Sequence, residues 1–210
     1  MIRVEHSVIG MCATNTYYAF NESTGEGFIV DPAGDVPKII DRVSKYGFRP
    51  NAVVVTHGHF DHVLAMQEVC EHYGIKSYIG AGEKEVLSSP DLNLTASFVG
   101  NPRTFDADVY LADGEEFSVA GYVIKVIETP GHTPGGVCYY IPDEKILFSG
   151  DTLFESSVGR TDFPGGSMSA ITRSISEKLM VLPDGTRVLP GHMDETDIGS
   201  EKKYNPYCSL

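Results

Sequence analysis

The chain has 210 residues, 41% of them hydrophobic, and its 16 Lys and Arg against 29 Asp and Glu give a net charge of −13. This length and apolar content suffice for one domain with its own core, which we place over residues 1–210. An acidic surface repels a phosphate backbone, so nucleic acid is not expected as a partner.

The start of the chain lacks the basic, apolar and small-residue regions of a signal peptide. No run reaches the roughly 18 consecutive apolar residues of a membrane span, so no membrane association is expected. The four scattered cysteines form no Cys-x-x-Cys pair, which is typical of reduced thiols. We therefore expect a cytoplasmic protein, and the sequence leaves its oligomeric state open.

Short β-branched runs alternate with amphipathic helical patterns along the chain. In chain order they predict strand 27–30, helix 36–46, strand 52–55, helix 63–73, strand 77–79, helix 83–88, strands 122–127, 137–141 and 145–148, helix 168–180 and strand 186–189. Asp143 and Glu144 predict a hairpin turn between two of these strands. Region 89–105 has weak periodicity and several Pro, Gly and Asn residues, which predicts an irregular excursion that covers the site. The mixture favours an α/β sandwich with sheets inside and helices outside.

Four of the predicted strands end within a few residues of a histidine or an aspartate. Loops at strand ends are where a rigid sheet presents its chemistry, so these groups are expected to converge in one cleft. A glycine adjoins each group and permits close backbone approach, although glycine can also simply end a strand. The groups are His57 with His59, His132, Asp151 and His192, and the glycines are Gly58, Gly131, Gly150 and Gly191.

Segment 56–62 holds four metal-ligating side chains within six residues. Their spacing of two directs His57, His59 and Asp61 to one side of an extended chain, and His62 follows as a helix begins near Val63. Imidazole and carboxylate groups bind zinc and similar metals. Seven ligands exceed one tetrahedral ion and predict two ions about 3.5–4 Å apart with a bridging carboxylate. The predicted ligands are His57, His59, Asp61, His62, His132, Asp151 and His192.

The pattern His57-x-His59-x-Asp61-His62, followed by His132, Asp151 and His192, resembles the metallo-β-lactamase-fold superfamily over nearly the whole chain. Segments 31–35, 129–135, 149–154 and 159–164 resemble its glyoxalase II group most. The resemblance implies a four-layer αββα sandwich of two mixed β-sheets flanked by helices. It assigns three ligands to each ion, with Asp151 as the bridge. The first set is His57, His59 and His132, and the second is Asp61, His62 and His192.

Several positions depart from particular relatives. Asp151 stands where zinc β-lactamases carry a cysteine, and His59 stands where flavodiiron oxygen reductases carry a glutamate. Met193 follows His192 where relatives often carry glycine. The sequence ends soon after His192, without the helical segment that holds the glutathione thioester in full-length glyoxalase II, so glutathione recognition is left open.

The expected function is a zinc-dependent, binuclear hydrolase of thioesters such as S-lactoylglutathione, with Fe or Mn also able to occupy either site. Two ions that share a water would lower its pKa from 15.7 toward about 7, and the bridging hydroxide would attack the carbonyl carbon. Asp61 is the predicted catalytic residue because it can orient that nucleophile. Arg160 is expected to contact an anionic thioester, with an ion pair to Asp162 or Glu155 as the alternative. Phe163 is expected to line the pocket or to pack in the core.

Other activities of the superfamily stay open. Persulfide dioxygenases share a segment like 159–163 and use one iron, held by the equivalents of His57, His132 and Asp151. A lactonase or a nuclease is a weaker alternative, since the net charge of −13 disfavours RNA binding.

Overall fold

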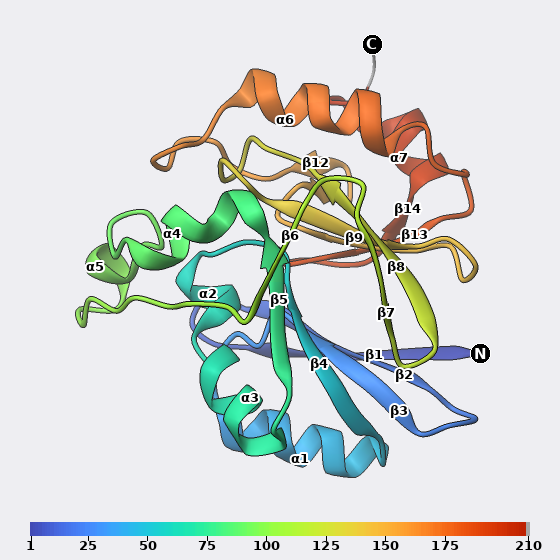
Figure 1. Cartoon of the computed structure of the whole chain (residues 1–210). Helices are drawn as coiled ribbons and strands as arrows, with labels where there is room; N and C mark the ends of the chain where they lie inside the picture. Colours follow the sequence, from blue (N-terminus) through green and yellow to red (C-terminus); the bar gives the residue numbers. More distant parts are fainter. Residues whose placement is uncertain (209–210) are drawn as a thin grey trace.

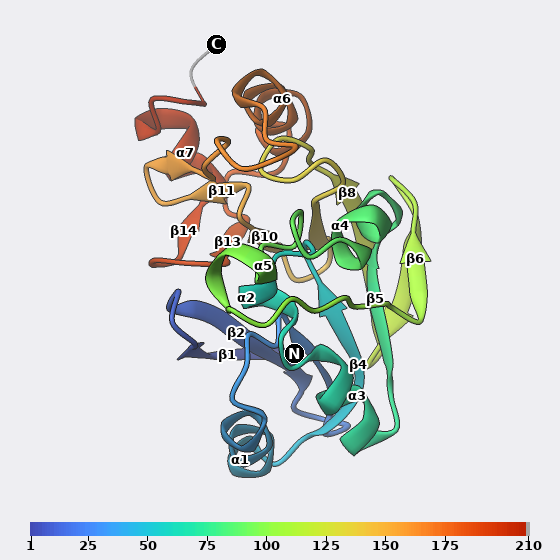
Figure 2. The same ribbon diagram turned by 90° about the vertical axis from the view of Figure 1, so that its left-hand side faces the viewer.

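The computed structural model describes residues 1–208. Two six-stranded mixed sheets pack face to face, and helices cover the outer face of each sheet (Figure 1; Figure 2). Helices α1 and α3 lie on one side of the molecule, and α6 and α7 lie on the opposite side. The predicted four-layer αββα sandwich is therefore confirmed.

The first sheet has the strand order β1-β2-β3-β4-β5-β6. Its first three strands are antiparallel, and β3 to β6 run parallel because helical crossovers connect them. The strands are β1 (Ile2–Ile9), β2 (Thr14–Asn21), β3 (Glu26–Val30), β4 (Arg49–Val55), β5 (Lys76–Gly80) and β6 (Val109–Leu111).

The second sheet has the order β14-β13-β10-β9-β8-β7 and is antiparallel except where β10 pairs with β13. The predicted hairpin turn at Asp143 and Glu144 joins β9 to β10, with Ile141 opposite Ile146. The strands are β7 (Glu116–Val119), β8 (Tyr122–Glu128), β9 (Val137–Ile141), β10 (Ile146–Gly150), β13 (Arg187–Pro190) and β14 (Thr196–Asp197), and a separate small hairpin comprises β11 (Leu153–Phe154) and β12 (Ser157–Val158).

The helices are mostly short. They are α1 (Val36–Tyr46), α2 (Phe60–Val63), α3 (Met66–Tyr73), the 3₁₀ turn η1 (Ala81–Glu83), α4 (Lys84–Ser88), α5 (Thr95–Phe98), α6 (Met168–Ser174), the π-helical segment η2 (Ile175–Leu179) and α7 (Ile198–Tyr204). The Ser167 hydroxyl caps α6 by accepting from the Ala170 N–H. The predicted helix 168–180 is thus present, and it ends in a π turn in which Met180 N–H donates to the Ile175 carbonyl.

The core follows the two-residue period of the strands. On β4, Ala52 and Val54 face the space between the sheets, whereas Val53 and Val55 face α1 and α3. All four side chains are at most 1% exposed. A third cluster lies under α6 and η2, where Ile171, Ile175 and Leu179 are fully buried at spacing four, as predicted. Burial on both faces explains why β4 reads as a continuous apolar run.

Three local predictions were wrong or incomplete. Helix 63–73 is broken, because Ala65 N–H donates to the Pro32 carbonyl and a separate short helix already begins at Phe60. Region 89–105 is irregular as predicted but includes α5. Strands β1, β2, β6, β7 and β14 and helix α7 were not predicted, although β2 is almost entirely buried. Across residues 1–208, no helix has both the length and the apolarity needed to span a bilayer.

Candidate metal centre

The ends of four strands bring the seven predicted ligand side chains together. His57 follows β4, Asp151 follows β10 and His192 follows β13, while His132 lies in the loop after β8. The sequence placed Asp61 on an extended segment, but it lies in the first turn of α2, with His62 beside it. The chain turns helical at Phe60, and Asp61 joins a second group of donors with His62 and His192.

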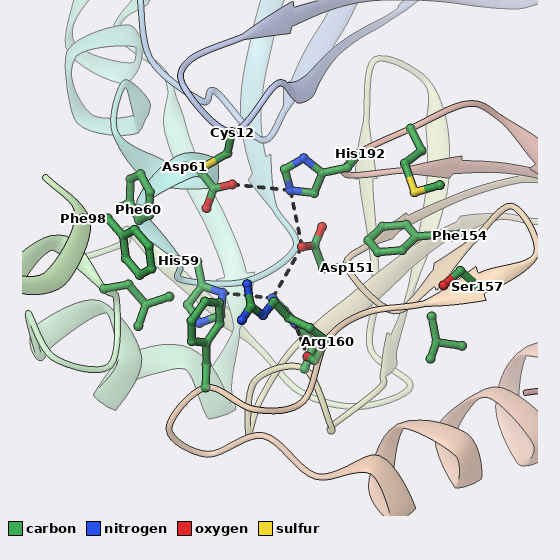
Figure 3. A pocket seen from close by; sticks show the side chains of 15 residues that line it. Cys12, His59, Phe60, Asp61, Phe98, Asp151, Phe154, Ser157, Arg160 and His192 are labelled. Atoms are coloured by element: carbon green, nitrogen blue, oxygen red, sulfur yellow. Dashed lines mark hydrogen bonds and ion pairs between the residues drawn. The ribbon is translucent and has the colours of Figure 1, made fainter.

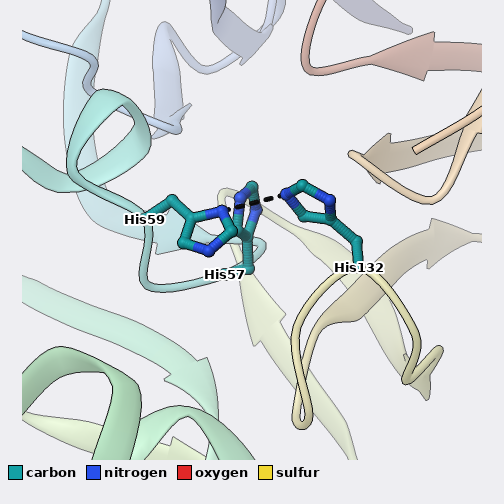
Figure 4. A group of neighbouring side chains, drawn as sticks. All are labelled: His57, His59 and His132. Atoms are coloured by element: carbon teal, nitrogen blue, oxygen red, sulfur yellow. Dashed lines mark hydrogen bonds between the residues drawn. The ribbon is translucent and has the colours of Figure 1, made fainter. Parts of the chain in front are cut away.

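His57, His59 and His132 form the first group, with one donor atom from each within 4.8 Å of the others (Figure 4). Nδ1 of His59 and Nε2 of His132 lie 2.9 Å apart. All three side chains are buried, with at most 5% exposed. The three rings therefore direct nitrogen atoms at one small volume.

Asp61, His62 and His192 form the second group, and Asp151 lies between the two. Oδ2 of Asp151 is 3.5 Å from Nε2 of His132 in the first group and 3.4 Å from Nε2 of His192 in the second. Its Oδ1 atom is 3.5 Å from Nε2 of His62. This is the position a carboxylate needs in order to bridge two ions.

Hydrogen bonds fix which nitrogen of His57 is free. The Thr56 hydroxyl has one proton, which it donates to Oδ2 of Asp31 at 2.8 Å. It can therefore only accept from Nδ1 of His57, 3.1 Å away, so that His57 keeps an unprotonated Nε2. The sequence pointed to segment 31–35 by resemblance but gave Asp31 no role.

Hydrogen bonds at Nδ1 also orient the rings of His62 and His132. Nδ1 of His62 donates to Oδ2 of Asp31 at 2.9 Å, and Nδ1 of His132 donates to the Arg160 carbonyl at 2.7 Å. Each bond leaves Nε2 facing the ligand cluster. Partners of this kind fix the tautomer and the ring direction of metal-binding histidines.

The donor atoms fit divalent metal ions. Nε2 of His57, Nε2 of His62 and Oδ1 of Asp151 are buried and have no hydrogen-bond partner in the described structure. Buried polar atoms without a partner are costly, and here they face one another. Five imidazoles and two carboxylates form a donor set suited to zinc, iron or manganese.

In the metal-free protein, burial dominates the pKa values of the ligands in the first group. Burial lowers the pKa of His57 well below its usual value and lowers that of His59 to about 3, helped by neighbouring imidazoles. Both rings are therefore neutral at pH 7, which is the form that binds metal.

Carboxylates reverse this effect in the second group. Burial opposes the charge on His62 and His192, but nearby carboxylates outweigh it and raise the pKa of His62 to about 9 and of His192 to about 11. Burial likewise opposes the charge of Asp61, yet His62 and His192 lower the pKa of Asp61 to about 2. The pKa of Asp151 is lowered for the same reasons.

Close backbone approach explains the glycine before His192. A Cβ at Gly191 would collide with Oδ1 of Asp151 and would lie 2.7 Å from Cε1 of His62. Gly159 is similarly constrained, because its Cβ would collide with the Asp151 carbonyl. A side chain at either position would displace the central carboxylate or its loop.

Sequence reasoning missed three polar residues that support the ligands. The Thr14 hydroxyl donates to Oδ2 of Asp61 at 3.0 Å, and the Asn15 amide donates to the carbonyls of Pro190 and Met193 on either side of His192. Glu83 is fully buried and accepts from backbone N–H groups of two ligand loops. None lies near a ligand in the sequence, so spacing could not identify them.

A pocket of about 410 Å³ opens above the ligands (Figure 3). His59, Asp61, His132, Asp151 and His192 form its floor, and mostly apolar side chains form its walls. This size and character are typical of a small-molecule site.

Arg160 and Phe163, the predicted substrate contacts, both line this pocket. The Arg160 guanidinium makes two hydrogen bonds to Asp162, at 2.7 and 2.6 Å, and lies 4.0 Å over the Phe163 ring. The ion pair to Asp162 that the sequence allowed is thus present, at a position where the guanidinium also reaches the pocket.

Comparison with known proteins places the chain in a family. The family model described as the Metallo-beta-lactamase superfamily matches residues 9–192. The chain is 36% identical over 202 residues to the probable metallo-hydrolase YqgX of Bacillus subtilis, covering 96% of this chain and 95% of that protein. It is 34% identical over 187 residues to the hydroxyacylglutathione hydrolase GloC of Haemophilus influenzae, covering 86% of each.

Solved structures agree with this placement. The BLEG-1 B3 metallo-beta-lactamase superposes with a TM-score of 0.93 at 36% identity, over 99% of this chain and 100% of that one. The structure of TTHA1623 in a di-iron-bound form superposes with a TM-score of 0.83 at 30% identity. The match covers 97% of this chain and 99% of that one. The structure of ETHE1 from Myxococcus xanthus superposes with a TM-score of 0.79 at 28% identity. The match covers 97% of this chain and 83% of that one. With its αββα fold and its cluster of seven donors, the chain belongs to the metallo-β-lactamase superfamily and is similar to the superfamily's glyoxalase II-like hydrolases.

Proposed function

We propose that the protein is a binuclear metal-dependent hydrolase of thioesters. The observation that carries the proposal is the position of Asp151 between two groups of three donors. His57, His59 and His132 would hold one ion, and Asp61, His62 and His192 the other. Zinc suits this donor set, and iron or manganese could replace it at either site.

When bound, the ions would supply Lewis acidity to the substrate carbonyl and a water acidic enough to react at neutral pH. Asp61 would accept a hydrogen bond from that water and orient it toward the acyl carbon. The Thr14 hydroxyl holds the carboxylate of Asp61 in place by donating to Oδ2. The water oxygen bonds to the acyl carbon, the C–S bond breaks, and the products are a carboxylic acid and a thiol.

The lining suits a thiolate leaving group best, because His192, Asp61 and Asp151 would all bind metal in the loaded site and would not be available to protonate a leaving group. The pocket's two carboxylates, Asp61 and Asp151, have lowered pKa values and are ionised at pH 7. Burial raises the pKa of the Cys12 thiol to about 11, so it is a poor proton donor. A thiol has a pKa of about 8.5 and leaves as thiolate without a general acid, whereas an alkoxide or an amine needs a proton.

The relatives support the same chemistry. GloC, at 34% identity, is described as a hydroxyacylglutathione hydrolase, which is a thioester-cleaving enzyme. The experiment is to measure metal content by mass spectrometry together with hydrolysis of S-lactoylglutathione and of a simple acyl thioester. We expect about two ions per chain and an activity that is lost with chelator. Absence of activity on every thioester in the metal-loaded protein would refute the proposal.

A persulfide dioxygenase is the second candidate. The resemblance of segment 159–163 to persulfide dioxygenases supports it. That activity would use one iron at His57, His132 and Asp151 and would leave His59, Asp61, His62 and His192 without a ligand role. One iron per chain, with oxygen uptake on glutathione persulfide and no thioester cleavage, would decide in its favour.

A further inference from the structure

Two apolar walls face each other across the ligand floor. Phe60, Phe98 and Phe163 form the aromatic wall, in which the Phe60 and Phe98 rings stack at 5.8 Å and Phe163 meets Phe98 edge-on at 5.8 Å. Figure 3 shows Phe60 and Phe98 on one side of Asp61 and Asp151, and Phe154 on the other.

Phe154, Val158 and Met193 form the opposite wall, supported by contact between the Phe154 and His192 rings at 6.2 Å. A substrate carbonyl at the floor would therefore have hydrocarbon on both sides.

Among the residues that line this pocket, Arg160 is the one Lys or Arg side chain. Two of the five N–H donors of its guanidinium bond to the two oxygens of Asp162, and the pair carries no net charge. A thioester of glutathione brings two carboxylates, and the lining presents no unpaired cation to receive them. The walls therefore favour an uncharged group.

The aromatic wall is held in position before any ligand binds. Asn93 is fully buried, and its amide donates to the carbonyls of Leu87 and Arg103 while its Oδ1 accepts from Thr95. The Asn93 carbonyl accepts from Phe60 N–H at 2.9 Å, which ties α5 to α2. Small-molecule sites are usually preformed and lined mostly by apolar side chains, as this wall is.

The opposite wall carries a strained residue at its rim. Met193 has φ of 66°, in the left-handed region that favours glycine, and its side chain is 60% exposed. Such strain costs about 1–3 kcal/mol and is retained mainly at functional sites. Seven other described non-glycine residues also have positive φ, so the argument for substrate contact rests on the position of Met193 in the pocket lining.

We infer that the site takes thioesters whose acyl group is an uncharged hydrocarbon chain, bound by burial between the aromatic wall and the opposite wall. This inference rests on the proposed thioester hydrolysis. It concerns the acyl half of the substrate, whereas the anionic group expected at Arg160 belongs to the thiol half. The acyl chain would displace water from both walls and place the carbonyl at the floor.

The test uses the metal-loaded protein and acetyl, butyryl, hexanoyl and octanoyl thioesters of N-acetylcysteamine, an uncharged thiol. Burial of each methylene should raise kcat/KM about fourfold until the pocket is full. S-hexanoylglutathione, matched in acyl group, should be no better than hexanoyl-N-acetylcysteamine. S-lactoylglutathione should fall below both.

Two variants, one from each wall, test whether the acyl chain binds between the walls. Met193→Gly removes side-chain contact and relieves the positive φ, so the fold should hold while the hexanoyl to acetyl ratio of kcat/KM falls about fourfold or more. Phe98→Ala should lower the same ratio. Tyr204→Ala, which truncates an exposed aromatic on α7, is the control and should leave the ratio unchanged.

The outcomes separate the inference from the proposed function. Cleavage of S-lactoylglutathione with a flat or falling acyl series would overturn the apolar site and leave thioester hydrolysis standing. No cleavage of any thioester would overturn both. A rising series that stays equally steep in both variants would place the acyl chain outside these walls and would also refute the inference.

Discussion

The backbone N–H of Gly58 donates to Oε2 of Glu83 at 2.6 Å, so the loop between His57 and His59 is fastened to a buried carboxylate. The other oxygen of Glu83 accepts from Gly135 N–H at 2.9 Å, in the loop that carries His132. One side chain thus holds together two loops that belong to different sheets. Burial raises the pKa of Glu83, and the Gly58 and Gly135 donors oppose that rise.

Glu83→Gln should lower the free energy of unfolding by about 2 kcal/mol, because an amide NH₂ would then face a backbone N–H in a buried site. Denaturant unfolding at pH 7 measures the change. Glu85→Gln, on the exposed face of α4, is the matched control and should stay within about 0.5 kcal/mol of the parent. Equal stability of the two variants would contradict the role given to Glu83.

Asp31→Asn should weaken metal binding about 10- to 100-fold, because an amide oxygen that accepts from the Thr56 hydroxyl and Nδ1 of His62 sets the amide NH₂ against the Thr56 backbone N–H. Competition with a chromogenic chelator gives the affinity. Asp41→Asn, on the exposed side of α1, serves as the control. An unchanged affinity in Asp31→Asn would show that Asp31 does not orient these ligands.

Gly191→Ala should abolish binding of at least one ion, since the added methyl group collides with Asp151 and crowds His62. Gly185→Ala is a matched control, because a Cβ there meets no atom within 4 Å. Metal content by mass spectrometry compares them. Full occupancy in Gly191→Ala would mean that the ligand loops can shift without loss of the site.

Metal binding at pH 7 should release about two protons, because the pKa values of His62 and His192, about 9 and about 11, leave both rings protonated in the metal-free protein. Protons compete with metal, so the affinity should fall as the pH is lowered below 7. Titration calorimetry in two buffers of different ionisation enthalpy counts the protons. A heat that is independent of buffer would disagree with these pKa values.

Asp162→Asn should release the Arg160 guanidinium from its ion pair and lower KM for S-lactoylglutathione several-fold. Adding Arg160→Ala to that variant should remove the gain. Steady-state kinetics on glutathione and N-acetylcysteamine thioesters shows whether the effect is confined to the charged substrate. An equal change on both would indicate a structural disturbance.

Much of the ligand cluster could be predicted because its signals are local. His57, His132, Asp151 and His192 each follow the end of a strand within a few residues, where a rigid sheet presents its loops. The helical position of Asp61 was not predictable from spacing, since α2 begins at Phe60, whose N–H donates to the carbonyl of Asn93, far away in the sequence.

Strand β2 shows why other parts could not be predicted. Thr14, Asn15 and Thr16 look like surface residues, yet all three are buried with at most 3% exposed. Their polar groups bond to Asp61, to the loop around His192 and to the Asp31 carbonyl. Their burial is explained by tertiary partners, which a hydrophobic pattern does not register.

The seven donors come from both sheets, four after β4 and three after β8, β10 and β13. A bound ion would therefore connect the two sheets of the molecule. Since the unfolded chain cannot assemble these donors, a metal at a hundred times its dissociation constant adds about 2.7 kcal/mol to stability. The supply of metal would then determine how long the protein resists proteolysis as well as how fast it converts substrate.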